Sequence, residues 1–418
     1  MAKYLIKGGK KLEGRLRVTG AKNSILPILA AVLLTSKPVV IYDCPRLADV
    51  ENMLLILKAI GCKVKREGTT LIIDSSTLST SVIPDRYVRE LRSSIIFLGA
   101  MLARMGEARV TYPGGCEIGQ RPINLHLSGL RQLGVKIDES HGYLDCSVTE
   151  LVGADIHLDY PSVGATENIM LAASRAKGYT VIRNAAKEPE IVDLQNFINS
   201  MGGNISGAGT NTIVIEGKEK YDATEYTVIP DRIVAGTYLL AAAITGSSIM
   251  VDNVVMEHIQ SIIAKLRNSG CVIKPYQNSV YISAPTRPKA IEHTITLPYP
   301  GFPTDMQALL MSYLTIAQGT SVITETIFEN RYKHVPELIR MGANIRVEGK
   351  TAIIQGVDRL TGTTVVARDL RGGAALVLAG LRADGCTVIE NIHHIDRGYD
   401  NLEENLRSIG ADIIRGED

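Results

Sequence analysis

The stretch Leu57-Lys58-Ala59-Ile60-Gly61-Cys62-Lys63-Val64 predicts the end of a helix, a turn at Gly61 and the start of a strand. The same phrase, an apolar helix, a glycine and a β-like run, recurs five more times at spacings of 68 to 73 residues. The six glycines are Gly61, Gly134, Gly202, Gly270, Gly342 and Gly410. Because glycine adopts the left-handed conformation without steric cost, each is expected to end a helix. The chain therefore reads as six copies of one unit.

A second phrase, an apolar and Ala-rich helix followed by a strand, lies between these glycines, as at Leu171 to Gly178. Together the phrases predict β-α-β-α-β-β in each unit, with the Ala-rich helices packed between sheets. A length of 418 residues favours two domains of three units each. We expect an α/β fold with one domain at 22–229 and another formed by 1–21 and 230–418, in which the strand before Gly20 closes the second domain.

Composition excludes several classes of protein. A formal net charge of +1 gives no indication of a nucleic-acid-binding or membrane surface. The first residues lack the apolar core of a signal peptide, and no apolar run is long enough to span a membrane. Six cysteines without a CxxC pair indicate a reducing compartment. The sequence therefore predicts a cytoplasmic protein that contacts neither nucleic acid nor membrane.

Polar residues recur where the Ala-rich helix of each unit begins. They are Lys22-Asn23, Arg92, Ser162-Val163-Gly164, Arg232, Asp305 and Arg371. Capping explains Ser162 and Asp305. It does not explain cations, which the helix dipole opposes at an N-terminus, so Lys22 and Arg92 favour an anionic ligand. For Arg232 and Arg371, capping and ligand binding both stay open.

The loops before the second helix of each unit carry further candidates. They include Pro113-Gly114-Gly115-Cys116-Glu117-Ile118-Gly119-Gln120-Arg121-Pro122, Glu188-Pro189-Glu190, Glu329-Asn330-Arg331 and Asp396-Arg397-Gly398. The first joins an expected strand (Ala108 to Tyr112) to a helix that starts near Asn124. Taken alone, it fits an ordinary glycine-rich turn as well as a lid that carries a reactive thiol.

Other chemistries lack their sequence signals. The chain has no phosphate-binding GxxxxGK[ST], no GxGxxG before a helix, no HExxH and no G-x-S-x-G. His393-His394 is interpreted as structural rather than as a metal ligand. We therefore expect no metal and no cofactor.

Several of these motifs together resemble the UDP-N-acetylglucosamine enolpyruvyl transferases. They are Ala21-Lys22-Asn23-Ser24, Pro113 to Cys116 with Gly119 to Pro122, Pro161 to Thr166, Glu188 to Asp193, Pro303-Thr304-Asp305, Phe328 to Arg331, Arg368 to Arg371 and Ile395 to Tyr399. The resemblance runs from the first residues to the last helix. It implies two domains of three βαβαββ units each, an inside-out α/β barrel with the active site in the cleft between them. It also implies transfer of enolpyruvate from phosphoenolpyruvate to the 3-hydroxyl of the sugar, the first committed step of peptidoglycan synthesis and hence of cell-wall growth and division.

The resemblance also implies roles for individual residues. Lys22, Arg121 and Arg397 look like the cations that bind phosphoenolpyruvate. Cys116 resembles the general acid, the site of a pyruvate-type adduct and the target of fosfomycin; Asp305 resembles the base. Matches to substrate-binding positions are Asn23, Arg92, Arg121, Pro122, Ile123, Asn124, Leu125, Ser162, Val163, Gly164, Ile327, Arg331, Asp369 and Arg371. Glu117 departs from the family's small apolar residue, and its carboxylate would oppose thiolate formation at Cys116.

Three alternatives remain. A 5-enolpyruvylshikimate-3-phosphate synthase shares the six-unit fold and phosphoenolpyruvate, but the PGGC loop and the Pro161 to Thr166 segment favour the nucleotide sugar. A silent paralogue that only binds UDP-N-acetylglucosamine is disfavoured by intact Lys22, Cys116, Asp305, Arg331 and Arg397. An RNA-terminal cyclase would need a basic surface that the net charge does not indicate. We expect a monomer that acts on two small molecules.

Overall fold

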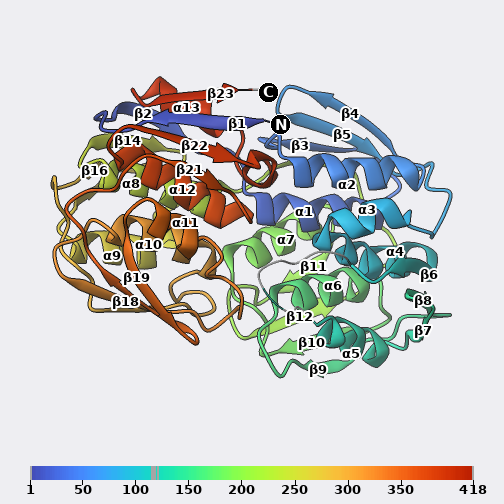
Figure 1. The fold of residues 1–418 in the computed structure, drawn as a ribbon. Helices are drawn as coiled ribbons and strands as arrows, with labels where there is room; N and C mark the ends of the chain where they lie inside the picture. The colour runs from blue at the N-terminus through green and yellow to red at the C-terminus, as the bar shows by residue number, and fades with distance from the viewer. Residues whose placement is uncertain (1, 114–118, 120–121, 417–418) are drawn as a thin grey trace. The chain divides into compact units, whose positions relative to one another are not determined.

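The computed structural model describes residues 2–113, 119 and 122–416. These residues form two compact units (Figure 1). The first unit comprises residues 20–113 and 122–229, and the second comprises residues 2–19 and 230–416.

The first unit contains three sheets around apolar helices. Its strands, in sheet order, are β13 (Thr224–Thr227), β3 (Val39–Tyr42), β5 (Thr70–Asp74) and β4 (Lys63–Glu67); β6 (Glu107–Thr111), β8 (Tyr143–Ser147) and β7 (Lys136–Ser140); β11 (Asn204–Ser206), β12 (Thr212–Glu216), β10 (Tyr179–Arg183) and β9 (Asp155–His157). Its helices are α1 (Lys22–Ala31), η1 (Val32–Leu34), α2 (Ala48–Ala59), α3 (Asp85–Glu90), η2 (Arg92–Ile96), α4 (Phe97–Met105), α5 (Asn124–Gln132), α6 (Val163–Ala173) and α7 (Pro189–Ser200).

The second unit repeats this plan. Its sheets are β15 (Val272–Pro275), β16 (Ser279–Ser283), β14 (Ser248–Asp252) and β2 (Glu13–Arg17); β17 (His293–Ile295), β18 (Thr320–Thr324), β20 (Thr351–Gln355) and β19 (Asn344–Glu348); β21 (Thr364–Val366), β22 (Cys386–Glu390), β1 (Lys3–Lys7) and β23 (Asp412–Gly416). Its helices are α8 (Arg232–Ile244), η3 (Met256–Ile259), α9 (Gln260–Asn268), η4 (Thr304–Met306), α10 (Gln307–Leu314), α11 (Val335–Arg340), α12 (Leu370–Arg382), η5 (Ile392–Arg397) and α13 (Leu402–Ser408).

Five of the six sheets share one pattern of strand directions. One parallel pair is followed by two antiparallel neighbours, as in β17-β18-β20-β19. In the last sheet, β1 from the start of the chain takes the place that a local hairpin strand has elsewhere, between β22 and β23. β2 likewise pairs with β14, so both N-terminal strands lie in sheets of the second unit.

The sixth sheet departs from the expected unit. The described strands β6, β8 and β7 form three antiparallel neighbours, and a single parallel bridge between Val82 and Arg109 stands where the fourth strand was expected. The prediction of a complete strand there was therefore wrong.

The Ala-rich helices form the two cores. In α8, twelve consecutive residues from Ile233 to Ile244 are buried, and α8, α10 and α12 pack against one another with α12 also against β1 and β22 (Figure 1). Helices α1, α4 and α6 are similarly buried in the first unit. In each unit the apolar helices therefore lie inside the sheets, and the cores are mainly aliphatic, as expected from a sequence with few phenylalanines and no tryptophan.

The glycine prediction is confirmed at all six positions. Their φ angles lie between 91° and 106°, in the left-handed region, and each follows the last turn of a helix. A side chain there would strain the backbone, so glycine sets where each of these helices ends.

Candidate active site

Lys22 is the first residue of α1, and Asp49 holds its ammonium group. Lys22 Nζ lies 2.6 Å from Asp49 Oδ2, and the two residues are only 8% and 2% exposed. Asp49 lies in the first turn of α2, which packs against α1. Because the helix dipole opposes a cation at this position, the carboxylate offsets an unfavourable placement. The pair keeps a buried cation at the start of α1.

The first turn of α1 is also anchored to α7. Ser24 donates a hydrogen bond to Asp193 Oδ2, and Tyr226 donates to Asp193 Oδ1 at 2.5 Å. Burial raises the pKa of Asp193, while the hydrogen bonds from Ser24 and Tyr226 act in the opposite direction. Asn23 therefore lies partly exposed between two anchored residues.

Ser162 begins α6 as an N-cap. Its Oγ accepts a hydrogen bond from the Ala165 N–H at 3.3 Å, so the capping prediction for Ser162 is confirmed. A Cβ added at Gly164 would lie 3.0 Å from His126 Cε1. Glycine at this position therefore lets the imidazole of α5 approach the start of α6.

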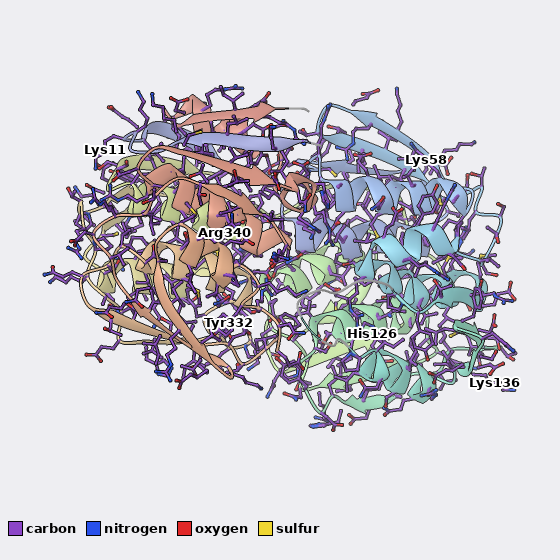
Figure 2. All side chains as sticks on the ribbon, viewed as in Figure 1. Lys11, Lys58, His126, Lys136, Tyr332 and Arg340 are labelled. Carbon is purple, nitrogen blue, oxygen red and sulfur yellow. The ribbon has the colours of Figure 1, made fainter. Side chains whose placement is uncertain are left out.

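His126 lies on α5 in the first unit (Figure 2), and α5 and η2 both pack against α6. Asn168 Oδ1 accepts from the Gly99 N–H at 2.6 Å, so its Nδ2 donates to Ile95 O at 3.0 Å and to His126 Nδ1 at 3.1 Å. Burial, and then the nearby charge of Arg92, lower the pKa of His126 to about 4. His126 is therefore neutral near pH 7 with its proton on Nε2. Asn168 of α6 thus joins η2, through Ile95, to α5, through His126, and these three elements begin with Arg92, Asn124 and Val163.

Asp305 in the second unit is held by two arginines. Arg331 Nη2 lies 2.6 Å from Asp305 Oδ1, and Arg371 Nη2 lies 3.1 Å from Asp305 Oδ2. Both arginines are 3% exposed, and each guanidinium lies 5.3 Å from an aromatic ring, Phe328 for Arg331 and Tyr399 for Arg371. This geometry shows that Asp305 is no N-cap, and Pro303 occupies the cap position of η4. The capping explanation of Asp305 was wrong.

Both guanidinium groups have N–H donors without an acceptor among the described residues. Nε and Nη1 of both Arg331 and Arg371 are buried and make no hydrogen bond within the described residues. Burial alone would lower the pKa of Arg371, but its interactions with Tyr399 and Asp305 raise it well above the usual range. Because a buried donor without an acceptor is costly, these four nitrogen atoms favour an anionic ligand beside the two arginines.

Aspartates, not arginines, cap the helices α8 and α12. Asp369 Oδ1 accepts from the N–H groups of Arg371 and Gly372 at 3.0 and 2.8 Å. Asp231 accepts two N–H groups at the start of α8 in the same way. The preceding carboxylates thus satisfy these helix ends and leave the side chains of Arg232 and Arg371 for other contacts.

Glu325 ties the loop of Ile327 to the turn of Asp305. Its Oε1 accepts from the N–H groups of Ile327 and Phe328 at 2.8 and 3.1 Å, and its Oε2 accepts from Thr304 Oγ1 at 2.8 Å. Glu325 is 1% exposed. This buried carboxylate therefore fixes Ile327 relative to the residue that precedes Asp305.

His334 lies buried beside the arginine pair. Neither ring nitrogen has a hydrogen-bond partner within the described residues. Burial lowers its pKa to about 4, with the charge of Asp369 acting to raise it and that of Arg331 to lower it. His334 is therefore neutral near pH 7.

The remaining predicted residues fall into two groups. Cys116 and Arg121, with Glu117, lie outside the described residues. Asn124 is the first residue of α5, Ile123 before it is buried and Arg397 is the last residue of η5. The structure thus brings Arg92, Asn124 and Val163 together in the first unit, and Asp305, Arg331, Asp369 and Arg371 in the second.

The described part of the chain holds neither a metal-binding cluster nor a membrane-spanning helix. No group of three His, Cys, Asp or Glu side chains there is arranged to hold a metal ion. None of the helices described combines the length and apolar character needed to cross a bilayer.

Comparison with known proteins shows the class of enzyme to which this fold belongs. Residues 6–406 match the family EPSP synthase (3-phosphoshikimate 1-carboxyvinyltransferase). The chain belongs to this family of enolpyruvyl transferases. Within it, the chain is 58% identical over 415 residues to UDP-N-acetylglucosamine 1-carboxyvinyltransferase 2 of Caldanaerobacter subterraneus subsp. tengcongensis, covering 99% of this chain and 100% of that protein. It is 50% identical to UDP-N-acetylglucosamine 1-carboxyvinyltransferase of Halothermothrix orenii, covering 99% of both chains.

Solved structures agree with this fold. The enolpyruvyl transferase NikO from Streptomyces tendae superposes with a TM-score of 0.89 at 26% identity, covering 99% of this chain and 98% of that one. EPSP synthase from Acinetobacter baumannii superposes with a TM-score of 0.78 at 19% identity over all of both chains, and this likeness concerns the fold alone. The predicted inside-out α/β fold is therefore confirmed.

Proposed function

We propose that the protein transfers enolpyruvate from phosphoenolpyruvate to the 3-hydroxyl of UDP-N-acetylglucosamine and releases phosphate. The observation that carries this proposal is Asp305 between two buried guanidinium groups, Arg331 and Arg371, with four nitrogen atoms that find no acceptor among the described residues. Relatives of at least 50% identity over the whole chain carry the corresponding enzyme name. The reaction is the first committed step of peptidoglycan synthesis and takes place in the cytoplasm.

Phosphoenolpyruvate is a small polyanion, which suits this set of cations. A planar guanidinium matches a carboxylate or phosphate with two parallel N–H groups, so Arg331 and Arg371 bind one end of the molecule. Lys22, Arg121 and Arg397 bind the phosphate. Charge on these residues stabilises developing negative charge without a metal or a cofactor.

The chemical step requires two proton transfers. Cys116 gives a proton to the methylene carbon of phosphoenolpyruvate as the sugar oxygen bonds to the adjacent carbon, and Asp305 removes the proton of the hydroxyl. Loss of phosphate and of a proton from the new methyl group then restores the double bond in the product. Cys116 also forms the phospholactoyl-type adduct.

The nucleotide sugar takes the other predicted residues. They are Asn23, Arg92, Arg121, Pro122, Ile123, Asn124, Leu125, Ser162, Val163, Gly164 and Ile327. Asp369 and Arg371 complete the substrate-bound site. The predicted domains at 22–229 and at 1–21 with 230–418, and a monomeric state, belong to the same proposal.

The test compares two acceptors. The protein is mixed with phosphoenolpyruvate and either UDP-N-acetylglucosamine or shikimate 3-phosphate, and released phosphate is measured. We expect phosphate to be released when the acceptor is UDP-N-acetylglucosamine and not when it is shikimate 3-phosphate. Release with shikimate 3-phosphate alone would identify the alternative, a 5-enolpyruvylshikimate-3-phosphate synthase. Binding of the nucleotide sugar without turnover would identify a silent paralogue.

A substitution at Cys116 tests the assigned acid. Cys116→Ala is expected to lose most turnover because no thiol remains to protonate the methylene carbon, while calorimetry still detects binding of UDP-N-acetylglucosamine. Fosfomycin should alkylate the wild-type protein once, as measured by mass spectrometry, and leave the variant unmodified. Unchanged turnover of Cys116→Ala would remove the assignment.

A further inference from the structure

Arg397 lies on a segment with little regular structure of its own. It is the last residue of η5, a six-residue 3-10 element that begins after Asn391, whose φ of 58° lies in the left-handed region. Such short elements have weak internal hydrogen bonds. The path of the backbone at Arg397 therefore depends in part on the contacts of its neighbours.

Arg415 holds the residue before Arg397. Arg415 Nη1 donates to Asp396 Oδ1 at 2.9 Å, and Arg415 Nη2 donates to Asp396 Oδ2 at 2.6 Å. Two parallel bonds from a planar guanidinium fix the direction of the carboxylate as well as its distance. Asp396 is thereby oriented from β23, the last strand described.

Arg415 is itself held by β1 and α13. Arg415 and Tyr4 are paired in the register of β23 and β1, and the guanidinium lies 5.8 Å from the Tyr4 ring. Arg415 Nη1 lies 3.5 Å from Glu403 Oε1, and Tyr4 donates to Glu403 Oε2 at 2.8 Å. Glu403 lies in the first turn of α13. Tyr4, Glu403 and Arg415 thus form a network, here called the clamp, and its Arg415 binds Asp396.

The other side of Arg397 is also fixed. Tyr399 is 3% exposed, its hydroxyl lies 2.9 Å from Thr237 Oγ1, and its ring packs under the Arg371 guanidinium. Arg397 therefore lies in the chain between two anchored residues. Asp396 is held by the clamp, and Tyr399 is held beside Thr237 and the Arg371 guanidinium.

We propose that Arg415 is a positioning residue that holds Arg397, through Asp396, for contact with phosphoenolpyruvate. The inference rests on the proposed function. A planar fork is needed for two bonds to Asp396, so lysine at 415 should restore the charge but only part of the orientation. The binding of phosphoenolpyruvate should depend on Arg415, and the binding of the nucleotide sugar should not.

The chain offers a matched control for this pair. Arg15 also makes two bonds to an aspartate, Asp252, at 2.9 and 2.8 Å, and Ser279 also donates a hydrogen bond to Asp252 in the described part of the second unit. Arg15→Ala therefore removes an equivalent exposed pair without touching Arg397. It measures what the loss of any such pair does to stability and turnover.

The experiment compares Arg415→Ala, Arg415→Lys and Arg15→Ala with the wild type. Phosphate release is measured while each substrate is varied, and phosphoenolpyruvate binding is measured by calorimetry. We expect Arg415→Ala to raise the KM and Kd for phosphoenolpyruvate about tenfold. The KM for UDP-N-acetylglucosamine should stay within about twofold of wild type, and Arg415→Lys should fall between Ala and wild type.

Two outcomes overturn the inference, and a third bears on the proposed function alone. Kinetics of Arg415→Ala equal to those of Arg15→Ala would show an ordinary surface pair. If Arg415→Ala raises the KM for both substrates equally and melts well below Arg15→Ala, the role of Arg415 is purely structural. In that case Tyr4→Phe, which removes the hydroxyl that donates to Glu403 but keeps Arg415, should also show no selective change in the KM for phosphoenolpyruvate. A wild type that binds phosphoenolpyruvate without turnover would refute the proposed function instead, and the calorimetric comparison would still test the clamp.

Discussion

The two units hold their buried charges in opposite ways. In the first unit one cation, Lys22, is matched by one carboxylate, Asp49, at 2.6 Å. In the second unit one carboxylate, Asp305, is shared by two guanidinium groups, Arg331 and Arg371, and some of their N–H groups have no acceptor in the described part of the chain. The first arrangement fixes a charge in place, and the second leaves an excess of positive charge. The comparison indicates that the second unit supplies the stronger attraction for an anion and the first supplies a positioned contact.

The largest expected effect comes from removing the excess charge. Arg371→Met keeps the side-chain volume but removes the N–H groups, so kcat/KM for phosphoenolpyruvate should fall about a hundred- to a thousandfold. Phosphate release at varied phosphoenolpyruvate measures this. Arg340→Met is the control, because Arg340 is exposed and lies 3.9 Å from its partner Glu337 (Figure 2). Similar kinetics for the two variants would contradict the role of the excess charge.

Removing the matched carboxylate should weaken the first unit. Asp49→Asn leaves the Lys22 ammonium buried without its anion, which should lower the free energy of unfolding by about 3 kcal/mol and reduce turnover about tenfold. Denaturant titration and phosphate release measure the two effects. Asp222→Asn is the control, since the Lys37–Asp222 pair has a similar distance of 2.5 Å but is exposed on both sides. If the free energy of unfolding falls by the same small amount in both variants, the buried Lys22–Asp49 pair stabilises the protein no more than an exposed pair does.

The smallest effect at neutral pH concerns one buried histidine in each unit. The pKa values of His126 and His334 are about 4 in the folded protein, below the ordinary value near 6.5. The folded state therefore binds fewer protons than the unfolded state between these values, so stability is full above about pH 6.5 and is lost as pH falls towards 4.

Glutamine at either position should make the free energy of unfolding less dependent on pH between 6.5 and 4. Each of His126→Gln and His334→Gln should remove up to about 3 kcal/mol of the decrease between pH 6.5 and 4. Denaturant titrations across this range measure it, with exposed His157→Gln as the control. An unchanged pH dependence in both buried variants would show that neither imidazole is kept neutral by burial.

The repeat made most of the fold predictable. Six glycines at regular spacing predicted six helix ends, and the apolar helices between them predicted two cores, because both signals are local. The incomplete sheet at Val82 was missed because its bridge to Arg109 depends on the geometry of neighbouring strands. The pairing of β1 between β22 and β23 links residues some 380 positions apart, and only the repeat pattern gave a reason to expect it.

The candidate site was less accessible to sequence. Recurrent helix starts and family motifs identified Lys22 and Arg371. An aspartate at a helix start usually predicts an N-cap, and at Asp305 this prediction was wrong because its carboxylate binds Arg331 and Arg371. Asp49 was missed because an acidic residue in a first helical turn is ordinary, and its partner lies on another helix. Glu325 and Arg415 were missed for the same reason, since their roles come from tertiary contacts.

The central claim is the identity of the two substrates. The most direct measurement is the mass of the product formed from phosphoenolpyruvate with UDP-N-acetylglucosamine and shikimate 3-phosphate present together. We predict that only the nucleotide sugar gains an enolpyruvyl group, with one phosphate released for each. Enolpyruvyl transfer to shikimate 3-phosphate, with the nucleotide sugar unchanged, would contradict the account.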